Sequence, residues 1–300
     1  MATRFRAAAA LAILTVGGAA RADGPAVKIG MVQGMFRDTQ PAMVQALSKP
    51  LRNLIQQQTG LSGVVEIVPD ARTLADKMKA GDFQLGVYHG FEFAWVQTTH
   101  PDLMPLVVTV PPARTLRAMV VVQSESPARK LADLADAVVL VPRGTKAHCF
   151  LYLDAQRTGF PIGTAKLQTK PALTSEEALD AVVQGDHAAA VVDASALLGY
   201  QSLQPGAARQ LRVLCESDAF PASVIAYQKG SLPAGTVEGV RRLLTEAHQT
   251  PAGKPLMMLW NLKGFEDVPA DYGDQLARIG KAYPTPDPAG FPGATAKTGK

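Results

Sequence analysis

The chain has 300 residues, 47% of them hydrophobic and 19% charged, which is typical of a compact globular protein and long enough for two domains. Its 30 Lys and Arg against 26 Asp and Glu give a net charge of +4. Three of those cations, Arg4, Arg6 and Arg21, lie near the N-terminus, so the rest of the chain carries only +1. This near-neutral charge argues against nucleic acid or an anionic membrane as a partner.

The N-terminus has the pattern of a secretory signal peptide. A basic start precedes the apolar run Ala7–Val16, and Ala20–Ala22 supplies small residues at the cleavage spacing. A transmembrane anchor is the alternative, but the run is well short of the roughly 20 residues that a span needs. We therefore expect residues 1–22 to be cleaved before Asp23 and the protein to be periplasmic.

Strand-like and helical runs alternate in the first part of the chain. The predicted strands are Val27–Val32, Val64–Val68, Phe83–Tyr88 and Leu103–Val110. Between the first two, apolar residues at helical spacing follow Pro41, and Pro50 should kink or split that helix. Alternation of this kind predicts an α/β fold with parallel strands and crossover helices.

One motif occurs twice. Leu74–His89 and Leu179–Asp193 each contain a helical run, a Gly-Asp turn and an apolar strand that ends on polar groups. Glycine stops a helix because it enters the left-handed region without a Cβ penalty. Open α/β sheets bind ligands at the carboxyl ends of their strands. The repeat therefore predicts two similar lobes, each offering one edge to a shared cleft.

A second set of elements begins after Pro111-Pro112. It comprises predicted strands at Leu116–Val122, Ala137–Val141 and Leu211–Cys215, short helical runs at Ala128–Leu134 and Ala194–Tyr200, and a helix from Thr145 to about Gly159. Thr174 and Glu177 form a capping box, which places another helix start at Ser175.

The chain then returns to the first lobe. We expect Ser223–Tyr227 to pair with Leu116–Val122, so that two crossings make a hinge. Lobe one is expected to span 23–115 with 226–283, lobe two 116–225, and a disordered tail 284–300.

The turn between strand and helix at Arg143–His148 is a candidate anion site. A helix N-terminus offers unpaired N–H groups and a partial positive charge, here at Gly144, Thr145, Lys146, Ala147 and His148. If Lys146 faces the cleft, it adds a fixed positive charge. The alternative is an ordinary capped helix start with solvated basic residues.

Three further candidates end the repeated strands. Tyr88 could donate a hydrogen bond to a ligand or stack on it, and His89 follows it. Asp193 could accept from a protonated ligand oxygen or hold an amine. The alternatives are that His89 is a capping or surface residue and that Asp193 merely caps the following helix.

Enzymatic and metal chemistry find little support. His148 and Cys149 are neighbours on a predicted helix, so their side chains point about 100° apart. The 5 His show no metal-ligand spacing, and we expect no metal, no cofactor and no catalytic site. Cys149 and Cys215 could form a disulfide in an oxidising compartment or remain two buried thiols.

From about Val27 to Ala282 the chain resembles the phosphate/phosphonate/phosphite-binding family of periplasmic ABC-importer receptors. The ordered segments that carry the likeness are Lys28–Met31, Thr59-Gly60, Gly81-Asp82 before Gly86–Gly90, Val120–Val122, Ser126-Pro127 before Leu131–Leu134, Val141–His148, and Gly185-Asp186 before Asp193. The resemblance implies a two-lobed type II periplasmic-binding fold, each lobe a mixed, mostly parallel sheet with flanking helices, joined by a two-strand hinge.

The resemblance also implies a ligand set. The family's Ser-Thr-Ser-Gly run falls on Thr145–His148, where only the first hydroxyl is kept, and its His falls on Ser175. Its Tyr and acidic positions match Tyr88 and Asp193. The implied function is capture of a small phosphorus oxyanion by hinge closure, as a monomer that delivers it to ABC permease subunits. A ligand sensor for a membrane kinase and a secreted enzyme on the same fold stay as alternatives.

Overall fold

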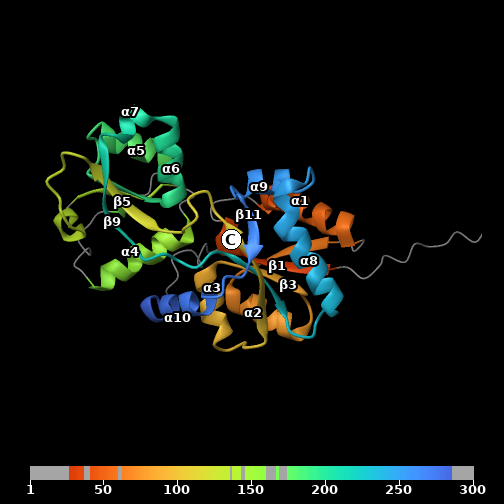
Figure 1. The fold of residues 1–300 in the computed structure, drawn as a ribbon. Helices are drawn as coiled ribbons and strands as arrows, with labels where there is room; N and C mark the ends of the chain where they lie inside the picture. Colours follow the sequence, from red (N-terminus) through yellow and green to blue (C-terminus); the bar gives the residue numbers. More distant parts are fainter. Residues whose placement is uncertain are drawn as a thin grey trace, which may run out of the picture.

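The structure, a computed structural model, describes residues 27–36, 41–59, 63–135, 137–142, 146–159, 167–168 and 174–285. The predicted signal peptide and nearly all of the predicted tail lie outside these ranges. Figure 1 shows two sheets, each with its own helices, joined by crossing segments. Over the described ranges we find no helix that is both long and apolar enough to cross a membrane.

The first sheet contains six strands in the order β11-β4-β10-β3-β1-β2. Their bounds are β1 Val27–Val32, β2 Gly63–Val68, β3 Leu85–Tyr88, β4 Leu103–Val110, β10 Val224–Gln228 and β11 Gly264–Asp267. β1 pairs in parallel with β2 and β3, whereas β10 runs antiparallel between β3 and β4. This sheet is therefore built from the two ends of the chain.

The second sheet contains five described strands in the order β7-β6-β8-β5-β9. Their bounds are β5 Ala118–Gln123, β6 Val139–Leu140, β7 Leu167–Gln168, β8 Ala189–Asp193 and β9 Leu211–Glu216. β6 pairs in parallel with β7 and β8, and β5 runs antiparallel between β8 and β9.

Both sheets follow one plan. In each, the strand that has just crossed from the other sheet, β10 or β5, lies antiparallel between two strands that are consecutive in the chain order of that sheet, β3 and β4 or β8 and β9. The remaining strands run in one direction, apart from the edge strand β11. The structure thus confirms the α/β fold with two mixed sheets, in which most of the described strands run in one direction although the pairings of β5, β10 and β11 are antiparallel.

Helices cover both faces of each sheet. Those of the first sheet are α1 Pro41–Thr59, α2 Ala71–Ala80, α3 Gly90–Gln97, α8 Ala234–Glu246, α9 Lys254–Leu259 and α10 Tyr272–Ala282, with the 3-10 turns η1 Gln33–Phe36 and η4 Ala247–Gln249. Those of the second are α4 Ala147–Gly159, α5 Ser175–Val183, α6 Ala194–Leu203 and α7 Pro205–Ala208, with η2 Leu131–Leu134. α1 begins at Pro41 as predicted and continues through Pro50, so the helix is not split.

Strand alternation sends neighbouring side chains to different cores. Leu85 and Val87 of β3 pack with α1, α8 and α9, whereas Tyr88 packs with α2 and α3. In the second sheet, Val121 and Val192 face α5 and α6. The core beneath α2 and α3 continues into the core beneath α4, so a single apolar cluster joins the two sheets.

The repeated motif forms the same local structure in both lobes. Gly81 and Gly185 both have positive φ angles, 87° and 81°. The following amide closes each turn in the same way, Asp82 N–H donating to Lys77 O at 2.9 Å and Asp186 N–H to Ala181 O at 3.0 Å. The turn therefore leads a helix, α2 or α5, into the strand β3 or β8, as the repeat predicted.

The predicted pairing of Ser223–Tyr227 with Leu116–Val122 is wrong. β10 begins at Val224 and already pairs there with the first sheet, while β5 pairs with β8 and β9. The crossing segments meet one step earlier, in an isolated antiparallel bridge between Leu116 and Phe220. The prediction failed because an apolar strand does not reveal which of two sheets it enters.

Candidate functional site

Lys146 and Asp193 form an ion pair at the carboxyl edge of the second sheet. Lys146 directly precedes α4, and Asp193 is the last residue of β8 and the N-cap of α6. The Lys146 ammonium lies 3.1 Å from Asp193 Oδ1, which also accepts the backbone N–H groups of Ser195 at 2.9 Å and Ala196 at 3.3 Å. Asp193 therefore caps the helix and also pairs with the lysine.

This pair changes the expected charge of the site. The lysine side chain is 36% exposed and the aspartate side chain 11%, so the lysine head remains within reach of solvent. Because the carboxylate balances the ammonium, Lys146 does not supply an uncompensated positive charge. A ligand anion must share Lys146 with Asp193 or take it from that residue.

His148 lies beside this pair on the first turn of α4. It is 4% exposed, and its Nε2 has no hydrogen-bond partner in the described part of the chain. Burial lowers the pKa of His148 to about 4. Asp193 and the Arg117 backbone oppose this shift in pKa, whereas Lys146 and His89 reinforce it. The imidazole is therefore neutral at pH 7, within electrostatic range of three other predicted site residues.

His89 is the counterpart from the first sheet. It is the N-cap of α3, where its backbone N–H donates to Glu92 Oε2 at 3.4 Å, and its ring stacks on Phe91 at 5.3 Å. Gly90 follows because the crossing segment passes close by: an added Cβ would lie 2.3 Å from Pro221 O. The structure thus brings together His89, Lys146, His148 and Asp193.

The position of Tyr88 argues against its predicted ligand contact. Its side chain is fully buried between the first sheet and α2, and its hydroxyl lies 3.2 Å from the Met78 sulfur. Burial strongly raises the pKa of this phenol. Tyr88 is a core residue here because its strand position points to the α2 face rather than to the strand end.

The other predicted residues fall into three groups. Ala147 is 7% exposed and packs in the core at the start of α4. Ser175 begins α5, where the Thr174–Glu177 capping box is confirmed, but no hydrogen bond between described residues joins it to Lys146 or Asp193. Gly144 and Thr145 lie outside the described residues.

Phe220 is the residue that the sequence analysis missed. Its ring, on the second crossing segment, lies 6.1 Å from Phe91, 5.4 Å from His148 and 4.9 Å from Tyr283. Nothing periodic marks it in the sequence, but it stands between Asp218 and Pro221, away from any strand or helix pattern. A large aromatic side chain in such a connection indicates a packing role between elements.

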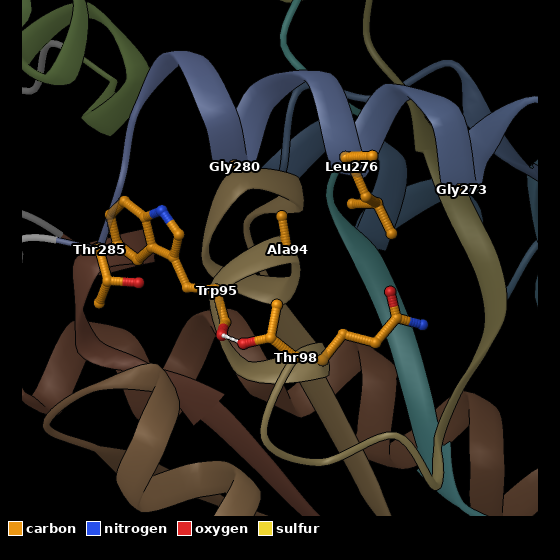
Figure 2. Close-up of a pocket in the computed structure, with 9 residues that line it drawn as sticks. Ala94, Trp95, Thr98, Gly273, Leu276, Gly280 and Thr285 are labelled. Carbon is orange, nitrogen blue, oxygen red and sulfur yellow. Dashed lines mark hydrogen bonds between the residues drawn. The ribbon is translucent and has the colours of Figure 1, made fainter.

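One pocket of about 350 Å³ lies elsewhere, between α3 and α10 (Figure 2). Small residues such as Ala94, Gly273 and Gly280 line it, with Trp95 and Thr285 at one end. It contains no charged side chain and none of the predicted site residues. It is therefore unsuited to an anion.

Two remaining predictions concern the cysteines and metals. Cys149 and Cys215 are free thiols, and Tyr152 donates its hydroxyl to Cys215 sulfur at 3.6 Å. Burial raises the pKa of both thiols, so neither is an activated nucleophile. A search of the described residues finds no group of three or more His, Cys, Asp or Glu placed to hold a metal ion.

Solved structures with the same fold include three bacterial proteins. PhnD1 from Prochlorococcus marinus (MIT 9301), in complex with methylphosphonate, has a TM-score of 0.59 at 12% identity, covering 85% of this chain and 97% of that one. A binding protein component of an ABC phosphonate transporter from Pseudomonas aeruginosa (PA3383) has 0.55 at 15%, covering 85% of each. XAC2383 from Xanthomonas citri, bound to chloride ion, has 0.60 at 15%, covering 86% and 97%.

At such low sequence identity, these structural similarities establish the fold alone, which is the two-lobed type II periplasmic-binding fold. No curated protein matches the sequence. A sequence profile described as "ABC transporter, phosphonate, periplasmic substrate-binding protein" matches residues 34–272. Because that match spans well over half of the chain, the protein belongs to the family of periplasmic substrate-binding proteins of phosphonate ABC transporters.

Proposed function

We propose that this protein captures a small phosphorus oxyanion (a phosphonate, phosphate or phosphite) in the periplasm and delivers it to the permease subunits of an ABC importer. The family supports a transport role, and the methylphosphonate complex of PhnD1 provides an analogy for the ligand. The observation that carries the proposal is the Lys146–Asp193 ion pair where β6 and β8 end and α4 and α6 begin.

The proposed ligand lies at the start of α4. Its oxygens accept hydrogen bonds from the backbone N–H groups at the start of α4 and from the Lys146 ammonium. Asp193 has a matching role, since its carboxylate can accept from a protonated ligand oxygen or hold a ligand amine. This arrangement favours a ligand whose own groups match a cation and an anion side by side.

Hinge closure provides the second half of the proposed mechanism. His89 belongs to the first lobe, and Lys146 and Asp193 to the second, so a ligand that touches both lobes favours the closed arrangement. Residues 1–22 act as the export signal, and the mature protein works as a monomer without a cofactor, a metal or nucleic acid.

The proposal is tested by calorimetry on the mature chain, residues 23–300, with methylphosphonate and inorganic phosphate. Lys146→Ala should weaken binding by about thirtyfold, because a charge-assisted hydrogen bond contributes about 2 kcal/mol. Lys79→Ala makes the same change of net charge on the exposed side of α2 and should leave the affinity unchanged. Equal affinities in both variants would place the ligand elsewhere.

A further inference from the structure

We propose that His148 is a proton-sensitive latch, such that protonation of its imidazole opens the lobes and lowers the affinity for the ligand in acid. This inference rests on the hinge closure proposed above and adds its regulation. His148 thereby acts on the conformation of the receptor, in addition to any contact that it makes with the ligand.

The latch is built around Phe220. His148 of α4 reaches this ring from the second sheet, while Phe91 of α3 and Tyr283 after α10 reach it from the first. His148 and Phe220 are each 4% exposed. An opening that separates these two rings would expose the His148 imidazole to water.

The buried nitrogen makes this contact sensitive to protonation. Neutral imidazole carries one N–H donor, whereas imidazolium carries two, each of which needs an acceptor. Nε2 has no acceptor among the described residues. Protonated His148 would thus hold a buried N–H group with no acceptor, which is unfavourable until the ring reaches water.

The charged groups around His148 do not compensate for this penalty. Lys146 and His89 disfavour a second positive charge, and the Asp193 carboxylate and the Arg117 backbone favour one. Asp193 is already engaged by the Lys146 ammonium and by two backbone N–H groups. Burial is the largest contribution, and the net result is the pKa of about 4.

The sign of the effect follows from the two pKa values. In the arrangement of the structure, burial lowers the pKa of His148 to about 4, whereas a solvated histidine has a pKa near 6.5. We take the arrangement with the ring buried as closed and the one with the ring in water as open. Between these values the open state binds more protons, so the closed state loses stability as the pH falls from 6.5 to 4. Lowering the pH from 7.5 to 5 should raise the ratio of open to closed molecules by about 30-fold.

The first experiment measures methylphosphonate affinity of the mature chain by calorimetry at pH 7.5 and pH 5. The comparison variants are His148→Phe, which keeps an aromatic ring without titration, and His248→Gln, which removes an exposed histidine on η4. The ionisation of methylphosphonate changes equally with pH for every variant, so it cancels when the variants are compared. Wild type and His248→Gln should lose up to about 30-fold more affinity than His148→Phe on acidification. An equal loss in all three overturns the latch.

A second measurement remains valid if the variant misfolds or methylphosphonate does not bind. Solution scattering of the wild-type chain gives its radius of gyration at both pH values, and NMR gives the pKa of the His148 ring. The latch predicts a larger radius at pH 5 and a ring pKa below about 5 when the lobes are closed. A ring that titrates near 6.5 under all conditions, or a radius of gyration that changes with ligand but not with pH, overturns the latch but not the proposed function.

Failure of every tested phosphorus anion to bind at pH 7.5 contradicts the proposed function. The pH series of the radius of gyration and of the His148 ring then tests the latch alone.

Discussion

Asp193 and Tyr88 show how differently two polar side chains near strand ends can be used. Asp193 stands at the last position of β8, where one carboxylate oxygen meets two helix amides and a lysine. Tyr88 is also the last residue of its strand, yet its phenol turns into the core. The spacing from Gly81 to His89 equals that from Gly185 to Asp193, so the true counterpart of Asp193 is His89. Both of these residues are helix N-caps.

Tyr88→Phe separates the core role of Tyr88 from a ligand role. Among the described residues, the hydroxyl donates its hydrogen bond to a thioether sulfur, a weak acceptor. Its removal should therefore lower the free energy of unfolding by no more than about 1 kcal/mol. Methylphosphonate affinity should not change. Urea denaturation and calorimetry on the same preparation measure both quantities. A tenfold loss of affinity in a stably folded Tyr88→Phe protein would return Tyr88 to the ligand set.

At the level of elements, the two Gly-Asp turns determine how a helix is joined to a central strand in each lobe. Gly81 and Gly185 adopt left-handed backbone angles at these turns. A Cβ at Gly81 would meet no atom within 4 Å, and one at Gly185 would meet only Gln123 Nε2 at 3.5 Å. The requirement for glycine at these positions is therefore one of backbone conformation rather than of space.

Alanine substitution tests that conclusion. Gly81→Ala and Gly185→Ala should each destabilise the protein by about 1–2 kcal/mol, the penalty for a side chain in the left-handed region. Gly239→Ala in α8 is the matched control, since its Cβ is also unobstructed but its backbone is helical. Gly239→Ala should stabilise the protein by up to about 1 kcal/mol, because alanine has the higher helix propensity. Denaturation midpoints measure the change in stability of each variant. A change of the same sign in all three variants would contradict the conclusion that Gly81 and Gly185 are needed for their backbone conformation.

Local patterns in the sequence predicted most of the elements. Leu103–Val110 matches β4, and the Thr174–Glu177 box marks the start of α5, because both signals depend on neighbours in the chain. The partner of β10 could not be predicted in this way, since pairing with β3 and β4 depends on contacts across more than a hundred residues.

The candidate site was predicted only in part. The repeat predicted that Asp193 lies at the end of a strand, and the strand-turn-helix pattern predicted the same for Lys146, so that both were expected at the carboxyl edge of the second sheet. Whether a side chain at that edge points outward or into the core depends on the strand register, which the sequence pattern did not specify for Tyr88. The burial of His148 depends on Phe220, a residue from a connection with no pattern of its own.

On the scale of the whole molecule, side-chain hydrogen bonds as well as the backbone connect the crossing segments with their surroundings. Arg117 donates to Glu216 at 3.1 Å and to Ser217 O at 2.7 Å, which ties one crossing segment to the other. Tyr272 of α10 donates to Ala222 O at 2.8 Å, next to Phe220. The C-terminal helix therefore holds the segment on which both lobes meet.

The placement of β10 between β3 and β4 has a consequence for how the polypeptide acquires its structure. The second sheet is formed from the continuous stretch 118–216, whereas the first lacks its connecting strand until residue 224 and beyond are present. Because long-range pairing is slow, the second sheet should gain protection from hydrogen exchange earlier during refolding than β3 and β4. Pulse labelling with mass spectrometry measures that order, and simultaneous protection of both sheets would contradict it. A chain that ends before β10 would leave β3 paired with β1 on one side only and β4 without the strands that flank it here, so that their free backbone groups are open to aggregation.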